Sequence, residues 1–539
     1  KTEVIEPSET KQVKLEITAQ SMASYDCYDR NTNSHTGYEL DEGEYVLRLM
    51  KNSHVPAIMT DGGASTVKFK LDAKVNYDTD EKTGNPVVNR FTGNDTIDGY
   101  PIDGSLEIVP VTYLSRANFA GTFPKAKIVR GINKDAETLA KAQTPSAAQL
   151  EKTGYADITE EPLTANDQGF TLEDMADADG YDDEFWATLI GQITKTELFE
   201  NIRNGFFNTV KMESIGKDSF VDLDGPLGLN TRVMSNTSCR FISYPGETLL
   251  AQTFDTTLAY RMGLSVGREA RDSDSGIRGW YGPAANIHRN PYCGRNGEYY
   301  SEDALLSGRF AAEAVRGAKN NGLYCYVKHF AANDSETLRE GLFTFMSEQT
   351  FREIYLKPYE ITVKDGGGNA LMTSMNRIGA VWAGASRALC TDILRGEWEF
   401  NGTLVTDWVD TGKGGYMPVY KGIWAGNDIW LNNPISQSLF DNKEYNNHAV
   451  FITLAQKVAH DTLWTLVDTQ QVSAAYDPSN DRALGGGGSS GGSRAWVWIV
   501  VAAEAAFAVP IGVFAWLIVK RRKEERSQDE QVKTYGGST

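Results

Sequence analysis

Apolar and polar residues alternate over several stretches of the first 80 residues. Residues 13–17 and 67–75 place an apolar side chain at every second position, and Tyr45–Met50 is a nearly continuous apolar run. A period of two residues, with glycine and asparagine between the runs, is typical of β-strands. We therefore expect residues 1–80 to form a β-sandwich.

Residues 81–185 follow as a polar, irregular connecting region. Its acidic stretch Glu173–Glu184 contains the letters DADGYDDE. In a calcium-binding loop the glycine would stand two positions later, and a bidentate glutamate would replace Thr188. We interpret the stretch as a solvated acidic surface that leads into a helix, because apolar side chains recur at helical spacing over 185–193.

Residues 186–475 alternate between short apolar runs and amphipathic stretches. The runs that predict strands are 220–223, 323–327, 370–373, 403–406 and 428–431, and the stretches that predict helices include 301–319 and 350–364. This rhythm of strand and helix predicts an α/β fold with a parallel (β/α)8-type barrel.

Polar side chains stand directly after four of the expected strands. They are Asp224, Lys328 with His329, Asn376, and Asp407. In a parallel barrel the carboxyl ends of the strands meet on one face, and that face carries the chemistry. One polar loop residue can merely cap a helix, whereas four at the same topological position predict a site.

The C-terminal region reads as a linker, a membrane span and a tail. Residues 476–494 include the run GGGGSSGGS, which is typical of a flexible tether. Residues 495–519 contain one ionisable side chain, Glu504, and are long enough to cross a bilayer as a helix. The tail 520–539 begins with KRRK, which predicts a cytoplasmic C-terminus by the positive-inside rule. We therefore expect a single-pass protein of the cell membrane with its larger part outside.

Composition excludes some classes of protein. The 53 Lys and Arg residues stand against 72 Asp and Glu residues, a net charge of −19, so little is available to neutralise nucleic-acid phosphates. The five cysteines include no CxxC pair, and the six histidines include no HxxxH pair, so we expect no metal site. The sequence begins with Lys1, and we expect a processed chain or a fragment.

Several motifs resemble glycoside hydrolase family 3, the β-glucosidase family. In chain order they are DGPLGLN (224–230), YGPAANIHRNPYCGRNGEYYSED (281–303), VKHFAANDSETLR (327–339), LMTSMNRIG (371–379) and TLVTDW (403–408). They resemble the barrel domain of that family, and residues 1–80 resemble its fibronectin-III-like domain. A fibronectin-like domain ahead of the barrel is similar to the order in circularly permuted members, which begin with an α/β-sandwich domain.

The resemblance implies a retaining mechanism that needs no cofactor. Asp407 stands at the position of the nucleophile, which forms a covalent glycosyl-enzyme. The residues at the positions that hold the sugar are Asp224, Arg295, Lys328 and His329. Trp408 stands where its indole can stack on the apolar face of the sugar ring.

Two departures from the family pattern concern the chemistry. Met375, which we include among the substrate-binding positions, stands where the family often has a tyrosine that hydrogen-bonds the nucleophile; Thr373, Ser374 or Asn376 are the candidates to replace it. The segment after KHF has the glucosidase-like form, in which the acid/base glutamate lies on the α/β-sandwich domain. In a permuted member that domain precedes the fibronectin-like one. We therefore expect the acid/base to come from a domain or a second chain outside this sequence.

The resulting hypothesis is a membrane-anchored exo-β-glycosidase that acts on β-linked glucosides or oligosaccharides. β-Glucosidase is the preferred hypothesis, and β-xylosidase or another exo-glycosidase of the family is the alternative within the enzyme class. Outside that class, a non-catalytic membrane-anchored sugar-binding protein stays open. The series of site motifs argues against an adhesive or purely structural surface protein.

Overall fold

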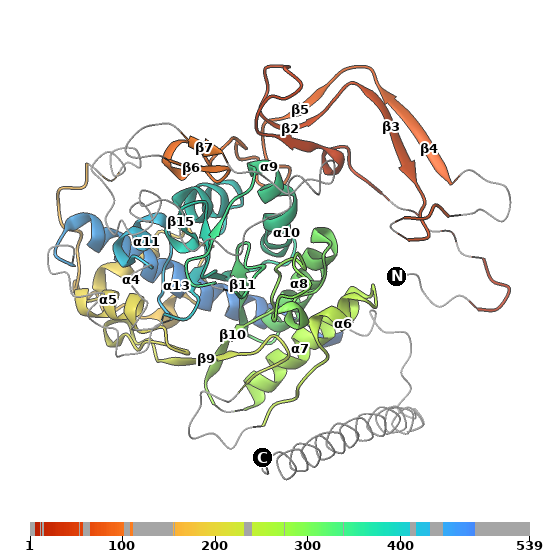
Figure 1. Cartoon of the computed structure of the whole chain (residues 1–539). Helices are drawn as coiled ribbons and strands as arrows, with labels where there is room; N and C mark the ends of the chain where they lie inside the picture. The colour runs from red at the N-terminus through yellow and green to blue at the C-terminus, as the bar shows by residue number, and fades with distance from the viewer. Residues whose placement is uncertain are drawn as a thin grey trace, which may run out of the picture. The chain divides into compact units, whose positions relative to one another are not determined.

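The computed structural model divides the chain into two compact units, Lys1–Tyr476 and Asp477–Thr539 (Figure 1). The described residues are 6–10, 12, 14, 16–52, 54–57, 65–101, 108–110, 155, 157–230, 240–273, 275–337, 339–409, 417–431 and 446–479. The expected membrane span 495–519, the tail and nearly all of the linker lie outside them. Within the described ranges, no helix is both long and apolar enough to cross a membrane.

A six-stranded sheet organises the larger unit. Its order is β16-β13-β11-β10-β9-β8; β8 runs antiparallel to β9, and the other neighbours are parallel. The strands are β8 Asn208–Thr209, β9 Phe220–Asp224, β10 Ile277–Tyr281, β11 Tyr324–Phe330, β13 Ala370–Thr373 and β16 Thr403–Thr406. Four of the five expected strands are therefore confirmed, and β8 and β10 are additional.

The segment 428–431 completes the ring of hydrogen bonds around this sheet. On one side, the Asp428 N–H donates to the Leu404 carbonyl at 2.8 Å. On the other side, the Trp430 N–H donates to the Ile202 carbonyl at 2.8 Å and the Gly205 N–H donates to the Trp430 carbonyl at 3.2 Å. The described ring thus consists of six strands and the irregular segments 202–205 and 428–431. One of the strands, β8, is antiparallel. This arrangement corrects the expectation of a regular (β/α)8 barrel.

The inside of this ring is mainly aromatic and aliphatic, and it contains the buried Asp222 carboxylate, which accepts hydrogen bonds from the Tyr324 and Tyr326 hydroxyls at 2.6 and 3.3 Å. Side chains from alternate positions of neighbouring strands form one buried cluster, as period-two alternation requires. The cluster contains Tyr281, Tyr324, Tyr326, Ala370, Met372, Val405, Ile429 and Leu431, together with Leu466 from the helix Ala449–Ala475. A much larger buried cluster includes residues of the covering helices.

Helices follow the strands along the chain and cover the sheet (Figure 1). They are α4 Phe185–Gln192, α5 Lys195–Arg203, α6 Glu247–Ala251, α7 Thr256–Asp272, α8 Ala304–Lys319, α9 Glu348–Thr350, the π-helix η8 Phe351–Leu356, α10 Lys357–Lys364, the π-helix η10 Ala388–Glu397, α11 Val419–Ala425 and α13 Ala449–Ala475. The expected helix 301–319 is confirmed as α8, which begins where the Asp303 carboxylate accepts the Leu306 N–H at 2.7 Å. The helices α7 and α8 approach so closely that a β-carbon at Gly263 would lie 2.0 Å from the Ala314 carbonyl oxygen.

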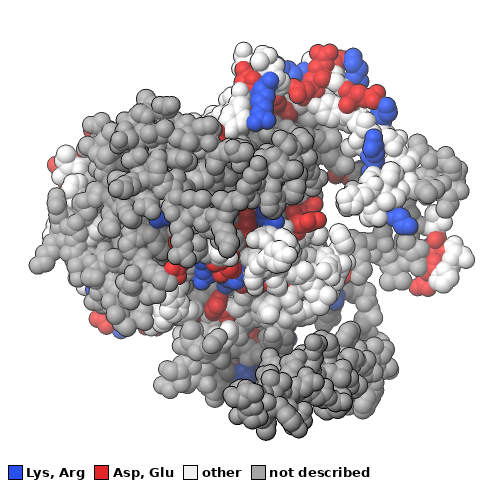
Figure 2. Space-filling view, viewed as in Figure 1, with Lys and Arg blue, Asp and Glu red and all other residues white. Residues whose placement is uncertain are grey.

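The N-terminal strands form two separate groups. β1 Ser24–Asp26, β2 Gly37–Leu40 and β5 Val75–Tyr77 make an antiparallel sheet, and β3 Gly43–Arg48 pairs with β4 Thr66–Leu71 as a two-stranded ribbon. Figure 2 shows Lys and Arg interspersed with Asp and Glu over this ribbon at the upper right. Val67 of the ribbon is 60% exposed, whereas Tyr25 and Leu40 of the three-stranded sheet are buried. The β-sandwich over residues 1–80 stays a prediction.

Buried ion pairs attach the chain near residue 90 to the helices of the barrel. Arg352 of η8 donates to Glu348 at 2.8 Å and to Glu397 at 2.7 Å, and all three side chains are at most 5% exposed. Glu348 also accepts the backbone N–H groups of Arg90 and Phe91. The Arg90 guanidinium reaches Glu397 at 2.9 Å. The beginning of the expected connecting region is therefore packed against the barrel.

Candidate active site

The sheet brings the expected site residues to one edge. Asp224 is the last residue of β9, Lys328 and His329 lie near the end of β11, and Asp407 follows β16 directly. Arg295 comes from the loop after β10. Because these strands are parallel, their carboxyl ends point the same way, and the side chains that follow them meet.

Asp224 and Lys328 form a partly buried ion pair. The Lys328 Nζ lies 2.7 Å from the Asp224 carboxylate; the lysine side chain is 4% exposed and that of Asp224 is 46% exposed. Burial raises the pKa of Asp224, but Lys328, the Gly225 backbone and Arg295 together outweigh burial and hold this pKa below its usual value. The pair therefore presents an ionised carboxylate to a ligand, and such a group can accept hydrogen bonds from sugar hydroxyls.

His329 is neutral and held in one orientation. Burial, together with the positive charges of Arg295 and Lys328, keeps its pKa well below the usual value. Arg295 Nη2 lies 3.1 Å from His329 Nε2, and because a guanidinium can only donate, Nε2 must be the accepting nitrogen. The proton therefore sits on Nδ1, which faces Asn286 Oδ1 and the Tyr299 hydroxyl, each at 3.3 Å.

Arg295 belongs to a cluster of alternating charges. It pairs closely with Glu298 and lies 3.6 Å from Glu336, which itself pairs with Arg339 at 3.2 Å. These side chains are 18–28% exposed, so they border the site without being sealed in it. Glu298 and Glu336 thus brace Arg295 against His329.

Asp407 combines burial with an unsatisfied oxygen. Its side chain is 10% exposed, and its Oδ1 accepts the Trp408 backbone N–H at 2.6 Å. Its Oδ2 is buried without a hydrogen-bond partner in the described structure and lies 3.8 Å from His329 Nε2. Burial raises the pKa of Asp407, and the positive charge of Arg339 offsets part of that effect. A carboxylate oxygen that no protein group occupies is available to react.

The side chains around Met375 do not hydrogen-bond the Asp407 carboxylate within the described structure, although the Asp407 backbone N–H donates to the Thr373 carbonyl at 3.0 Å. Met375 is 4% exposed and belongs to the large core cluster. The Thr373 hydroxyl lies 3.0 Å from Asn427 Oδ1, and the Ser374 hydroxyl donates to the Ala331 carbonyl at 2.9 Å. The Asn376 amide donates to the same carbonyl and to Thr344. The side chains that could replace the family's tyrosine are therefore committed to other partners.

Trp408 stands at the exposed rim next to Asp407. It is 39% exposed and meets Phe206 edge-on, with ring centroids 5.2 Å apart and an interplanar angle of 75°. Phe207 is 6.0 Å from the same indole. Sequence reasoning missed both phenylalanines; the adjacent FF pair follows Gly205 in a short stretch whose only signal is its composition.

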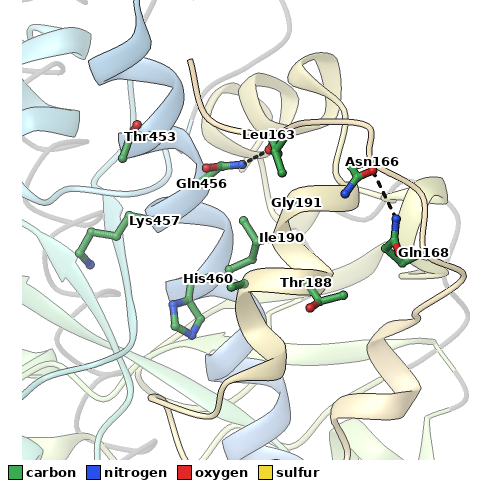
Figure 3. A pocket seen from close by; sticks show the side chains of 11 residues that line it. Leu163, Asn166, Gln168, Thr188, Ile190, Gly191, Thr453, Gln456, Lys457 and His460 are labelled. Atoms are coloured by element: carbon green, nitrogen blue, oxygen red, sulfur yellow. Dashed lines mark hydrogen bonds between the residues drawn. The ribbon is translucent and has the colours of Figure 1, made fainter. Parts of the chain in front are cut away.

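A hollow lies away from these residues on the larger unit, between α4, α13 and the segment 163–168. It is a groove of about 660 Å³ that none of the expected site residues lines. Figure 3 shows Gln456 of α13 hydrogen-bonded to the Leu163 carbonyl, at 2.7 Å, with Lys457 and His460 further along the helix.

The described residues contain no cluster of three or more His, Cys, Asp or Glu side chains that could hold a metal ion.

Comparison with known proteins identifies the family of the central region. Residues 187–438 match the model of the glycosyl hydrolase family 3 N-terminal domain. The chain is 30% identical over 457 residues to beta-glucosidase A of Butyrivibrio fibrisolvens, covering 82% of this chain and 49% of the relative. It is 29% identical over 423 residues to a beta-glucosidase of Ruminococcus albus, covering 76% of this chain and 39% of the relative.

A solved structure supports the same fold. The crystal structure of a beta-glucosidase from Paenibacillus barengoltzii superimposes with a TM-score of 0.60 at 24% identity, covering 85% of this chain and 47% of that one. The chain thus spans about half the length, or less, of the relatives it matches. Residues 187–438 belong to glycosyl hydrolase family 3 as its N-terminal domain, and the chain is a homologue of β-glucosidases.

Proposed function

We propose that this chain supplies the nucleophile and the sugar-binding side chains of a retaining exo-β-glucosidase. The observation that carries the proposal is the buried Asp407 carboxylate, whose Oδ2 has no hydrogen-bond partner in the described structure and lies 3.8 Å from His329 Nε2. In this mechanism Asp407 attacks the anomeric carbon, the bond to the leaving oxygen breaks, and water later hydrolyses the glycosyl ester. The relatives named as β-glucosidases support glucose as the sugar.

The other residues hold the terminal sugar beside Asp407. The Asp224–Lys328 pair offers one ionised acceptor and one donor to adjacent hydroxyl groups. His329 is neutral and accepts from Arg295, so its Nε2 cannot act as the general acid. The neutral imidazole instead lies beside Asp407 without adding to the positive charges of Arg339, Arg295 and Lys328.

The acid/base residue comes, in this proposal, from a domain or chain outside the present sequence. A positioned acid is typically worth 10²- to 10⁴-fold in rate. The chain on its own should therefore react with glucosides of strongly activated phenols, which leave without a proton, and be slower by about that factor with alkyl glucosides. β-Xylosidase activity is the alternative for the same machinery.

The expected membrane anchor adds a location to the proposal. Residues 495–519 would cross the membrane once and place the glycosidase domain outside the cell, with the KRRK tail in the cytoplasm. This arrangement suits a sugar-releasing enzyme that works on external glucosides.

The test is covalent trapping of Asp407. The full chain is incubated with 2,4-dinitrophenyl 2-deoxy-2-fluoro-β-D-glucoside, and its intact mass and peptide masses are measured. We expect one added fluoroglucosyl group on the peptide that contains Asp407, and none in Asp407→Asn. Asp272→Asn, which alters an exposed carboxylate, is the matched control and should label normally.

Labelling elsewhere, or equal labelling of Asp407→Asn, would contradict the assignment. Labelling only by the corresponding xyloside would move the function to β-xylosidase. Glucose binding without any trapping would favour the non-catalytic sugar-binding protein, for which the intact Asp224–Lys328 pair is the supporting observation.

A further inference from the structure

A chain of aromatic rings runs from the rim of the site into the interior of the barrel. Trp408 meets Phe206 edge-on at 5.2 Å, and Phe206 meets Phe207 edge-on at 4.9 Å. Phe207 then meets Tyr281 at 5.6 Å and 89°, and Tyr281 stacks on Tyr326 at 4.8 Å and 18°. Both tyrosines belong to the buried interior cluster. The exposed indole is thus connected through ring contacts to two buried tyrosines.

The turn that presents Phe206 is fixed on several sides. The Gly205 N–H donates to the Trp430 carbonyl at 3.2 Å, and the Phe207 carbonyl accepts the Asp222 N–H at 3.0 Å. A β-carbon at Gly205 would lie 2.1 Å from Ile429 Cγ2, so only glycine allows this approach. The turn therefore has little freedom to move, and Phe206 is held in place against Trp408.

Trp408 is exposed where its neighbours are not. Its exposed fraction is 39%, whereas that of Val409 is 1% and the Asp407 side chain is 10% exposed. The indole therefore lies on the solvent side of the carboxylate. In an exo-acting site the terminal sugar occupies the inner end and the leaving group points toward solvent. An aromatic surface at the rim is consequently suited to contact the leaving group.

We propose that Phe206 is a positioning residue that orients Trp408 as a platform for flat, apolar aglycones. The proposal rests on the proposed glucosidase function and names its preferred substrate class, aryl β-glucosides. Phe206 does not touch the reacting atoms. By holding one side of the indole edge-on, it fixes the angle of the ring, and an aromatic aglycone gains contact only when that angle is maintained.

The test compares binding of two glucosides that need no turnover. Titration calorimetry on the full chain gives Kd for phenyl and for methyl 1-thio-β-D-glucopyranoside, whose sulfur link resists hydrolysis. In Phe206→Leu we expect the preference for the phenyl compound to fall about threefold to tenfold, the size of one aromatic contact. Kd for the methyl compound should stay unchanged, and Phe206→Tyr should restore the preference because it keeps the ring.

The controls separate positioning from folding. Phe185→Leu removes a stacked phenylalanine pair with Phe170 on α4 and should leave both Kd values unchanged. Phe206→Met, which keeps the bulk without the ring, provides a second variant if the leucine form does not fold. An unchanged ratio, or equal weakening of both ligands, would overturn the inference while the proposed function stands. If the parent chain binds neither glucoside and is not trapped, the function fails and the inference with it.

Discussion

His329 owes its neutral state to its neighbours. Its imidazole is 2% exposed, and it faces Arg295 on one nitrogen and uncharged acceptors on the other. Two factors therefore act in the same direction: burial disfavours the charged ring, and the guanidinium repels it. His329 therefore stays uncharged at the near-neutral pH where a free histidine would take up a proton.

The pH dependence of trapping should follow Asp407. The nucleophile must be ionised, so the trapping rate rises as pH passes upward through its pKa. Because burial raises that pKa, we expect the acidic limb above the ordinary carboxyl value of about 3.9. His329 should contribute no change near pH 6.5, where a free histidine titrates, because it stays neutral.

The measurement is the rate constant of labelling by the fluoroglucoside over a pH series. Arg339→Gln should move the limb to higher pH, since the Arg339 charge favours the ionised form of Asp407. Arg268→Gln is the matched control, because Arg268 is exposed and pairs with Asp272 on the surface. A limb at the ordinary carboxyl value, or an unchanged limb in Arg339→Gln, would contradict this account.

Four site residues could be predicted from the sequence, because a polar residue at the end of an apolar run marks the end of a strand. Asp224, Lys328, His329 and Asp407 each interrupt or follow an apolar run, and the structure brings them together. Phe206 could not be anticipated. Its contact with Trp408 joins residues about 200 positions apart in the chain, and no local pattern encodes which turn will meet which strand end.

At the scale of elements, the joint between the N-terminal segment and η8 depends on buried charge. Arg352 is 4% exposed and serves two glutamates that are themselves nearly inaccessible. Removing one member of such a group leaves the others uncompensated, which costs far more than losing a pair on the surface. The stability of this joint therefore depends on the set being complete.

We expect Arg352→Met to lower the free energy of unfolding by about 3–5 kcal/mol. Glu348 and Glu397 would lose their shared partner, although Arg90 would still reach Glu397. Urea unfolding followed by fluorescence measures the change. Arg268→Met, which removes only an exposed pair, should change stability by at most about 1 kcal/mol. Equal effects of the two substitutions would mean that the buried set contributes no more than a surface pair.

Some elements were predictable and others were not. α8 combines a long amphipathic stretch with an N-terminal aspartate, so its position follows from local rules. β10 was missed because the sequence IRGWY alternates poorly and contains a glycine. That glycine is required by packing, since a β-carbon at Gly279 would lie 2.2 Å from Asp222 Oδ1. Such a tertiary approach leaves no periodic signal.

At the scale of the whole molecule, we expect the chain to be attached to a membrane. The expected span 495–519 lies outside the described residues, and its apolar length is the reason to expect it. In a flotation experiment we expect the full chain to rise with phospholipid vesicles. The double variant Phe507→Asp, Val509→Asp should remain in the dense fraction, because each central aspartate costs about 2.5–3.5 kcal/mol on insertion.

The control for flotation is Ser490→Asp, which adds charge in the Gly/Ser run and should float like the parent. Retention of the double variant with the vesicles would show that another part of the chain holds the lipid. Absence of the parent from the floating fraction would remove the basis for the proposed location.

The closure of the ring by residues 428–431 affects how the chain folds while it is being synthesised. A ribosome releases β9 and its parallel neighbours long before Trp430, which joins the last strand to Gly205 and Ile202. Until then the growing sheet has two unpaired edges and an apolar interior open to water, and such intermediates aggregate readily. We therefore expect nascent chains that stop before residue 428 to be bound by chaperones, and release to follow once that segment has emerged.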